Sequence, residues 1–409
     1  MEHKIPRVGP LGLLAGVAGE VAATSRAVWS ADTERTEPTR PVAAPTEPAQ
    51  PNTGAGTGAE PGGELDVVVI GAGVAGLSAA RVLADAGKNV IVVEARSRIG
   101  GRLWTQPDAM SVPIELGAQF IHGRNASTWE LVRQLGLQTY THGHTLSRTR
   151  VGGPWKKKNL RFPSNFQVVG GYEQILTPLA DQLSVQLDTV VHRVEHSPGH
   201  AVVHAEQQGG PVTYRARAVV VALPVAVLNA DAVEFSPALP QEKTAAFRAV
   251  PHVAISKVIM EFDRPVFPDD ADHVVEAGSQ LWLMNAAMGN PEHSGRIIFA
   301  GAEEEEAERL LAMPAERRHK EYLEVIRGIA GDPGLTPVKV MEHEWAKDPF
   351  ARAAFTHSWK VTGVRKIYQP VGDTLFWAGI VTDQVDFSHD SGTQAAARLL
   401  SRLGWVPAR

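Results

Sequence analysis

The 409-residue sequence predicts an α/β fold with a parallel sheet of the Rossmann type, and three features of residues 65–102 lead to this prediction. Two apolar runs, at 67–70 and 90–93, are typical of buried parallel strands. Between them the glycine-rich turn GAGVAG at 71–76 opens a segment whose apolar residues recur at helical spacing. An acid, Glu94, ends the second run about 20 residues after the glycines. This order of strand, turn, helix, strand and acid is typical of a βαβ unit that binds a dinucleotide.

Each glycine of the turn has a physical reason to be there. Gly71 permits the tight turn, Gly73 lets the backbone approach a pyrophosphate, and Gly76 lets the helix pack closely on the strand. The helix N-terminus offers free N–H groups to that pyrophosphate, and Glu94 can accept hydrogen bonds from a ribose hydroxyl pair. The alternative is a glycine-rich turn without a ligand, which the complete unit disfavours.

The residues after Glu94 indicate which dinucleotide is bound. Arg96 can neutralise a pyrophosphate, and Gly100 with Gly101 lets the backbone lie along an extended cofactor before Arg102. This arrangement is typical of FAD-binding flavoproteins. The string from Glu94 to Arg102 resembles the amine oxidase superfamily, which includes monoamine oxidases, polyamine oxidases, L-amino-acid oxidases and histone lysine demethylases.

Composition limits the other partners. With 40 basic and 45 acidic residues, the bulk charge does not favour nucleic acid. The absence of cysteine excludes disulfides, thiolate metal sites and a cysteinyl link to the flavin. We therefore expect no metal site and a non-covalently bound FAD, with a histidyl link as the open alternative.

Residues 1–64 differ in character from the rest of the chain. From 34 to 63 the sequence is rich in Pro, Thr, Ala, Gly and Glu and has almost no large apolar residues, which predicts a disordered tether. The mildly apolar stretch 8–21 weakly resembles a secretory signal and is shorter than the roughly 20 residues that a membrane span needs. We expect a cytoplasmic protein without a membrane span, with secretion as the alternative.

Residues 113–123, PIELGAQFIHG, resemble a segment of polyamine oxidases whose backbone passes the flavin ring. The resemblance implies that Gly117, Ala118, Gln119 and Phe120 line the isoalloxazine and that His122 faces the substrate. A structural histidine in a loop is the equal alternative for His122.

The next segment is shorter than in that family. It predicts one helix at 128–137 and a basic, loop-like stretch at 142–161, so the substrate domain is reduced. Lys156, Lys157 and Lys158 indicate a solvated charge run, with contact to an acidic partner as the alternative.

Residues 170–224 return to the cofactor domain. A helix after Gly170-Gly171-Tyr172 and strands at 187–194, 201–205, near Tyr214 and at 218–223 follow the family order. Val191 matches a family valine whose backbone meets the adenine.

The strand at 255–262 carries the residue that we expect to matter most for chemistry. Lys257 shares a face with Ile255 and Ile259, opposite Val258 and Met260. A lysine among apolar neighbours is costly to bury unless it is used. The resemblance implies that Lys257 holds a water against flavin N5; the alternative is an edge-strand lysine that reaches solvent.

Two further segments extend the resemblance. A helix is expected at 303–311 and a strand at 338–345, followed by a stretch close to the family's W-x-x-DPFARGAYS, in which Phe355 and Trp359 are candidates for the walls of the amine pocket. Ordinary core packing is the equal alternative for both.

Residues 369–405 resemble the closing flavin segment, which places Gly379 and Ile380 at the cofactor. Ile380 stands where the family has a glutamate, and the loop after it is short. We expect Ser391-Gly392 to begin the last helix and its N-terminus to stabilise negative charge at flavin N1 and the C2 carbonyl.

The resemblance implies a glutathione-reductase-like FAD-binding domain at 65–123, 167–246 and 365–405, with an interleaved α+β substrate domain at 124–166 and 247–364. The implied reaction is hydride transfer from the C–H next to an amine nitrogen to flavin N5, imine hydrolysis, and reduction of dioxygen to hydrogen peroxide. A related desaturase or dehydrogenase, or a catalytically weak FAD-stabilised binding protein, are the alternatives. The sequence does not indicate an oligomeric state.

Overall fold

The computed structural model describes residues 65–142, 144–148, 154, 156–159, 165–267, 271–276, 280–287, 290 and 292–405. The expected tether at 1–64, with its signal-like stretch, lies outside the described residues. Within the described ranges, no helix is long and apolar enough to cross a membrane.

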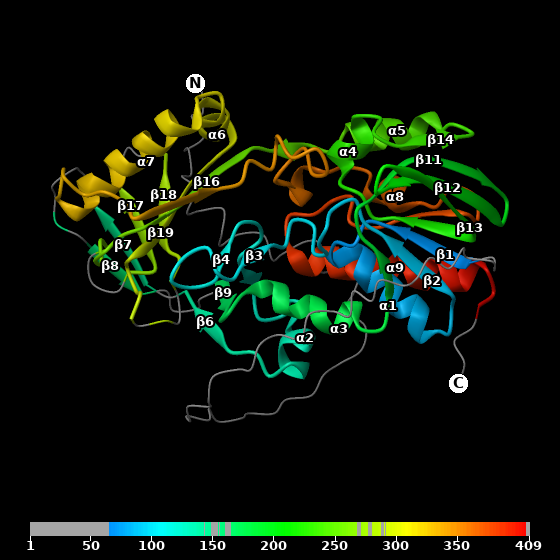
Figure 1. The fold of residues 1–409 in the computed structure, drawn as a ribbon, viewed down its shortest axis with the longest axis horizontal. Helices are drawn as coiled ribbons and strands as arrows, with labels where there is room; N and C mark the ends of the chain where they lie inside the picture. The colour runs from blue at the N-terminus through cyan, green and yellow to red at the C-terminus, as the bar shows by residue number, and fades with distance from the viewer. Residues whose placement is uncertain are drawn as a thin grey trace, which may run out of the picture. The chain divides into compact units, whose positions relative to one another are not determined.

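An eight-stranded sheet forms around the predicted βαβ unit (Figure 1). Strand β1 (Leu65–Ile70) lies between β2 (Val90–Val93) and β13 (Gly210–Val221) and is parallel to both. The outer parallel strands are β10 (Ser184–Gln186) beside β2 and β22 (Leu375–Trp377) beside β13. The long β13 continues into an antiparallel layer with β12 (His200–Gln207) and β11 (Thr189–Ser197), and β14 (Glu234–Ser236) closes the edge. The two strands expected near Tyr214 and at 218–223 are therefore one.

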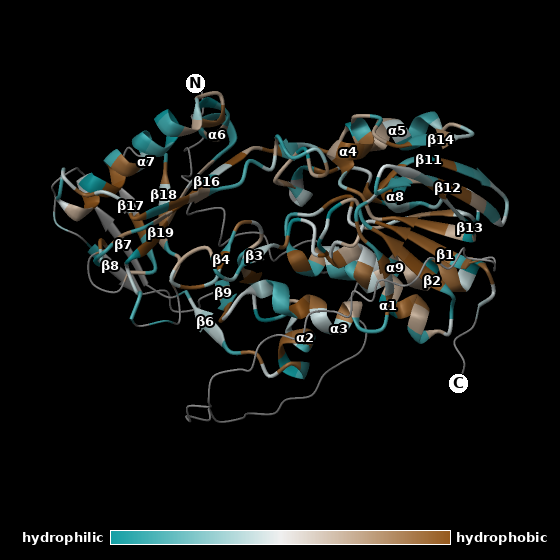
Figure 2. Ribbon diagram, viewed as in Figure 1, coloured by the Kyte–Doolittle hydropathy of each residue, from teal (hydrophilic) through white to brown (hydrophobic). Residues whose placement is uncertain are grey.

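The central parallel strands are apolar at 67–70, 91–93 and 218–221, because both faces of the sheet are covered there (Figure 2). Alternate side chains such as Val67 and Val69 pack against α1 (Val74–Asp85), α3 (Leu176–Ala180) and α9 (Val385–Arg402). Val68 and Ile70 point the other way, toward α4 (Val225–Asn229), α5 (Gln241–Arg248) and α8 (Val364–Tyr368). The apolar runs of the sequence thus mark strands buried on two sides.

A seven-stranded sheet carries Lys257. Its order is β20 (Lys339–Glu342), β16 (Ile255–Glu261), β19 (Ile297–Glu303), β18 (Trp282–Asn285), β17 (His273–Glu276), β7 (His144–Arg148) and β8 (Lys156–Asn159). Val258 and Met260 face α6 (Glu304–Leu311) and α7 (Ala315–Ala330), whereas Ile259 packs on the opposite face with Leu116. The predicted division of β16 into two faces is confirmed.

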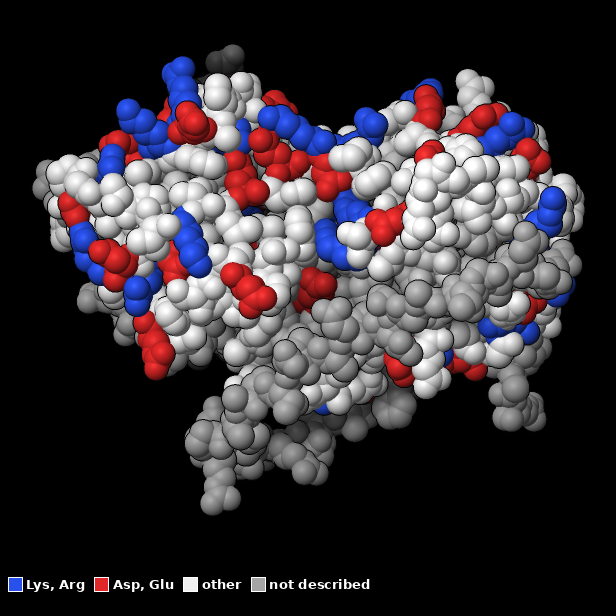
Figure 3. Space-filling view, in the orientation of Figure 1, with Lys and Arg blue, Asp and Glu red and all other residues white. Residues whose placement is uncertain are grey.

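The loop expected at 142–161 is wrong, because β7 and β8 form a hairpin there. Strand β8 begins at the lysine run and lies at the edge of the sheet. Charged residues, and lysine above all, are common in edge strands. Apolar alternation, the usual sign of a strand, is therefore missing. Acidic and basic side chains are interspersed on the face that Figure 3 shows.

Short elements join the two large sheets. Strands β5 (Ile121–His122), β9 (Asn165–Val168) and β6 (Thr139–Thr141) form one small sheet with β9 in the middle. Strand β3 (Thr105–Gln106) pairs with β4 (Ile114–Glu115), and β15 (His252–Val253) pairs with β21 (Phe355–Thr356). The expected helix at 128–137 is α2 (Trp129–Gln134), and the expected helix after Gly171 starts with the 3-10 helix η3 (Tyr172–Ile175).

The expected start of the last helix is also wrong. Helix α9 begins at Val385, so Ser391 and Gly392 lie about two turns inside the helix. A Cβ on Gly392 would lie 2.1 Å from the carbonyl oxygen of Ala75, so this glycine lets α9 pack against α1 instead of opening a helix. The first turn of α9 carries an acid, Asp386.

Candidate active site

The glycine turn between β1 and α1 is sterically constrained at two of its three glycines. Gly71 has a φ of +101°, and a Cβ there would lie 2.8 Å from the carbonyl oxygen of Ala222. A Cβ on Gly76 would lie 1.8 Å from the carbonyl oxygen of Gly71. On Gly73 it would meet nothing closer than the carbonyl oxygen of Gly100, at 3.9 Å. The backbone at Gly73 is thus open toward a ligand, as its predicted role requires.

The second glycine loop lies against the first. Gly73 and Gly100 form an isolated β-bridge, and a Cβ on Gly101 would lie 3.4 Å from the Cα atom of Gly73. Gly73 caps α1 without a side-chain hydrogen bond, and the first turn of α1 carries no acid. The N-terminus of α1 therefore presents its N–H groups and positive dipole end beside both loops.

The Glu94 carboxylate is buried behind this turn. Its Oε2 accepts a hydrogen bond from the Ala72 N–H at 2.8 Å, and its Oε1 accepts one from the Arg96 N–H at 2.9 Å. Each oxygen still has a lone pair for another donor. Ribose binding by Glu94 stays a prediction that this geometry permits.

The two predicted arginines differ in their partners. The Arg96 guanidinium pairs with Asp348 at 2.6 Å. Arg102 donates to the carbonyl oxygen of Ala354 at 3.1 Å and to Thr382 Oγ1 at 2.7 Å. Burial, and next the positive charge of Arg96, lower the pKa of Arg102 to about 10. In the described part of the chain no carboxylate pairs with Arg102, so an anion there would be stabilised.

Lys257 lies against the predicted flavin-lining segment. Its Nζ donates to the carbonyl oxygen of Gly117 at 3.2 Å and to Gln119 Oε1 at 3.4 Å, and lies 4.2 Å from the ring centroid of Phe299. The residue is only 8% exposed and its strand lies inside the sheet, so the edge-strand alternative is wrong. The structure therefore brings Lys257 to Gly117 and Gln119, which lie about 140 residues earlier in the chain.

A buried acid balances this lysine. Burial lowers the pKa of Lys257, and the Glu115 carboxylate opposes this. Burial likewise raises the pKa of Glu115, although the Tyr172 N–H donates to that carboxylate at 2.6 Å. Because the amine has a lowered pKa, it can exchange a proton with a nearby water at neutral pH.

His122 is held by the neighbouring strand. Its Nδ1 lies 3.0 Å from Asn165 Oδ1. Burial lowers the pKa of His122, while Asn165 and the Asp383 charge oppose this change. Phe120 contacts the ring of His122 and, edge-on, the ring of His142 with 4.6 Å between centroids. The structure thus places Phe120 between two histidines.

The other predicted residues occupy different surroundings. Gly379, with a φ of +64°, donates from its N–H to Ser391 Oγ at 2.9 Å. The Ile380 side chain is buried in the apolar core beside Trp377, so only its backbone can meet a cofactor. Val191 is buried on β11 next to a register shift. Half-buried Phe355 stacks edge-on against His357. The Trp359 side chain lies outside the described residues.

Several polar residues of this region are not predicted as site residues by the sequence: Glu115, His142, Asn165, Gln167, His273 and Asp348. All are buried or nearly so. One signal was present, because Asn165-Phe166-Gln167-Val168 alternates polar and apolar residues as a strand does. The contacts of Gln119 with Gln167 and of His142 with His273 join distant segments, and no local sequence pattern predicts them.

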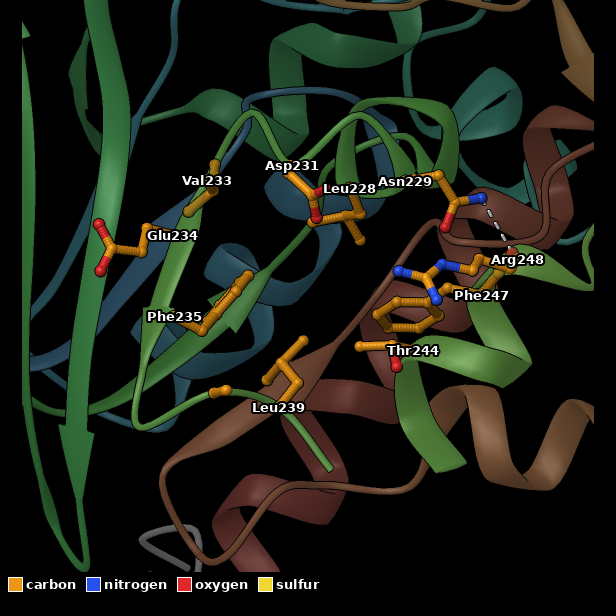
Figure 4. A pocket seen from close by; sticks show the side chains of 11 residues that line it. Leu228, Asn229, Asp231, Val233, Glu234, Phe235, Leu239, Thr244, Phe247 and Arg248 are labelled. Atoms are coloured by element: carbon orange, nitrogen blue, oxygen red, sulfur yellow. Dashed lines mark hydrogen bonds between the residues drawn. The ribbon is translucent and has the colours of Figure 1, made fainter. Parts of the chain in front are cut away.

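A separate cavity of about 350 Å³ lies between α4, β14 and α5. Leu228, Phe235 and Phe247 contribute apolar lining, and Arg248 lies at its side (Figure 4). The Asn229 side chain donates to the carbonyl oxygen of Phe247 at 3.1 Å. None of the predicted site residues lines this cavity.

The residues around the glycine loops fit an FAD molecule. The open backbone at Gly73 and the Arg102 guanidinium suit a pyrophosphate. Gly117 and Ala118 are partly exposed beside Lys257, which leaves backbone accessible to a flat ring.

Comparison with known proteins agrees with this arrangement. The family model for flavin-containing amine oxidoreductases matches residues 74–151 and 155–400. Putrescine oxidase of Kocuria rosea is 24% identical, over 84% of this chain and 95% of that protein. Lysine-specific histone demethylase 1 homolog 3 of Arabidopsis thaliana is 22% identical over 83% of this chain, which spans 30% of that longer protein.

Solved structures share the fold. Wild-type putrescine oxidase bound to putrescine has a TM-score of 0.70 at 19% identity, covering 83% of this chain and 99% of that one. Cyclohexylamine oxidase from Brevibacterium oxydans has a TM-score of 0.70 at 18% identity, covering 84% and 100%.

Proposed function

Because this chain belongs to the flavin-containing amine oxidoreductase family, and is thus an FAD-dependent oxidoreductase of the amine oxidase type, we propose that it oxidises a small-molecule amine. When bound, FAD would supply a hydride acceptor for the carbon next to the amine nitrogen and a source of the two electrons that reduce dioxygen to hydrogen peroxide. The imine product is hydrolysed by water to an aldehyde or ketone.

One observation carries this proposal: the buried amine of Lys257 lies within hydrogen-bonding distance of the Gly117 carbonyl oxygen and Gln119. A lysine without a carboxylate hydrogen bond is costly in such a place unless its amine is used. The Glu115 charge opposes the effect of burial on the pKa of Lys257, so this acid favours the protonated form of the amine.

The proposed cofactor contacts divide by chemistry. Gly71, Gly73 and Gly76 with the α1 N-terminus would hold the pyrophosphate, together with Arg96 and Arg102. Glu94 would hold the ribose and the Val191 backbone the adenine. The backbone from Gly101 and Gly117 to Phe120, with Gly379 and Ile380, would border the ribityl chain and ring. Non-covalent binding is part of this proposal.

The chain's own residues would perform three tasks. Lys257 would hold and polarise a water, because its amine has a lowered pKa and two acceptors orient it. His122 would face the substrate as an uncharged acceptor, because burial lowers its pKa. The apolar cluster of Ile259, Met284 and Phe299 would exclude other water from this side.

A specific observation favours a second candidate, a catalytically weak FAD-stabilised protein with a binding role. Helix α9 begins with Asp386 in its first turn, close to Asp383 and Asp390. Burial, together with these two charges, raises the pKa of Asp386 to about 6. An acid at a helix N-terminus opposes the stabilisation of another negative charge there.

A spectroscopic experiment distinguishes the two. The purified protein is expected to be yellow, and an amine substrate is expected to bleach its flavin under anaerobic conditions. In Lys257→Met the flavin should stay bound, because methionine fills a similar volume, while reduction or re-oxidation slows at least about tenfold, equivalent to roughly 1.4 kcal/mol.

Lys339→Met is the matched control, because Lys339 is exposed on the neighbouring strand β20. It should behave as the parent does. If no amine of a broad panel bleaches the flavin, this result would support the binding role. Equal rates in Lys257→Met and the parent would remove Lys257 from the proposed site.

A further inference from the structure

Strand β9 has one face in the core and one face toward the candidate active site. Phe166 and Val168 pack into the apolar cluster under α1 and α3. Asn165 and Gln167 alternate with them, so their amides point to the other side. They are only 9% and 6% exposed. Two buried amides on one face are costly unless each has a defined partner.

Asn165 is joined to His122 in two ways. The two residues are paired across β5 and β9, and Asn165 Oδ1 lies 3.0 Å from His122 Nδ1. An amide oxygen only accepts, so Nδ1 carries the proton and Nε2 keeps its lone pair. The backbone oxygen of Asn165 accepts from the His142 N–H at 3.0 Å, which holds the strand from its other edge.

Gln167 acts on Lys257 through Gln119. Gln167 Oε1 accepts a hydrogen bond from Gln119 Nε2 at 3.3 Å, and Gln119 Oε1 accepts one from Lys257 Nζ at 3.4 Å. A primary amide has one accepting and one donating end. With its donating end on Gln167, Gln119 must turn its oxygen toward the lysine. The reversed amide would place an N–H against the amine.

We propose that β9 is the positioning strand of the active site, in which Asn165 sets the tautomer of His122 and Gln167 sets the orientation of the Gln119 amide that holds Lys257. The catalytic meaning of this inference rests on the proposed function. Asn165 and Gln167 are positioning residues, because they act through His122 and Gln119.

The tautomer of His122 tests the first half without any turnover. In the FAD-loaded protein labelled with ¹⁵N-histidine, the His122 signal, assigned with His122→Gln, should show a protonated Nδ1. In Asn165→Leu, which nearly preserves the volume, the proton should move to Nε2. In Asn165→Asp, which keeps an acceptor, it should stay on Nδ1. A protonated Nδ1 in Asn165→Leu, or a protonated Nε2 in the parent, would overturn the role of Asn165.

Flavin reduction by an amine tests the second half. Gln167→Met keeps the volume and removes the acceptor, so reduction should slow about tenfold. Gln167→Glu restores an acceptor and should recover most of that rate. The matched control is Gln207→Met, since Gln207 forms a comparable pair with Gln186 on the other sheet, and it should leave the rate unchanged.

The Gln119 side-chain NH₂ signal provides a readout that does not depend on activity. It should be protected from hydrogen exchange in the parent and in Gln167→Glu, and should lose that protection in Gln167→Met. Retained protection and an unchanged rate in Gln167→Met would overturn the role of Gln167. Should the parent oxidise no amine, the proposed function fails, while the two NMR measurements still decide whether β9 positions these side chains.

Discussion

Acidification should destabilise this protein through a buried histidine pair. His142 Nδ1 lies 2.9 Å from His273 Nε2, and the two residues are 1% and 9% exposed. Burial lowers the pKa of His273 to about 4, although the Asp272 charge opposes this. Burial also lowers the pKa of His142, and the His273 ring adds to that effect. Both imidazoles are therefore uncharged in the native protein at neutral pH.

The free energy of unfolding falls on acidification because the unfolded chain binds more protons than the native protein. Below its ordinary pKa of about 6.5, the histidine of the unfolded chain binds a proton that native His273 does not accept until about pH 4. The free energy of unfolding is therefore unaffected by His273 above about pH 6.5, and it falls as the pH drops from about 6.5 to about 4. The full loss for His273 is about 3 kcal/mol, of which roughly 2 kcal/mol is lost by pH 5. His142 changes stability in the same direction.

Urea unfolding of the parent and of His273→Gln at pH 7.5, 6.0 and 5.0 measures this loss. The comparison is needed because Glu115, whose pKa is raised by burial, changes stability in the opposite direction over part of this range. The parent should lose about 2 kcal/mol more than His273→Gln between pH 7.5 and 5.0. Parallel pH dependences in the two proteins would refute the argument.

Three further changes test other parts of the structure. Gly76→Ala places a Cβ 1.8 Å from the Gly71 carbonyl oxygen, so the purified protein should contain little flavin; a normal flavin-to-protein ratio would contradict this. Glu94→Ala removes the acceptor of two buried or part-buried N–H groups, so FAD retention on dilution should weaken by about 1–3 kcal/mol; unchanged retention would show that the acid does not support the site. Arg318→Met breaks buried pairs with Glu342 at 2.7 Å and Glu344 at 2.9 Å and should cost about 3–5 kcal/mol in urea unfolding, whereas the exposed Arg309→Met should cost no more than about 1 kcal/mol; similar losses in both would count against the special role of burial.

The sequence predicts best where one local pattern determines the structure. Strand β2 has the predicted bounds, because a run of four apolar residues buried on both faces has few other solutions. The start of α9 was missed because Ser391-Gly392 looks like a helix cap, whereas Gly392 serves a contact with Ala75 that no local pattern reports. The β7–β8 hairpin was missed because backbone pairing at a sheet edge does not need apolar residues.

In the candidate site, too, residues in a clear local pattern are predictable and contacts between distant segments are not. Lys257 was predicted because its strand alternates clearly and its family position could be recognised, and the burial of its amine agrees with that expectation. The groups that act on it come from two distant segments, one holding Glu115 and Gln119 and the other holding Gln167. Their sequences contain ordinary amides and an acid, and only the folded chain shows that these groups are buried together.

The close contact between α1 and α9 has a consequence for how the protein is made. Gly392 touches the backbone of Ala75 in the first turn of the helix that faces the glycine loops, across more than 300 residues of chain. The ribosome synthesises residues 65–102 long before it reaches residue 392. The proposed FAD-binding site around residues 65–102, here called the nucleotide cradle, therefore stays incomplete through most of translation. Contacts of such long sequence separation form late and slowly. We therefore expect nascent chains that stop before α9 to capture no flavin and to depend on chaperones, whereas release of α9 completes the cradle in a single late step.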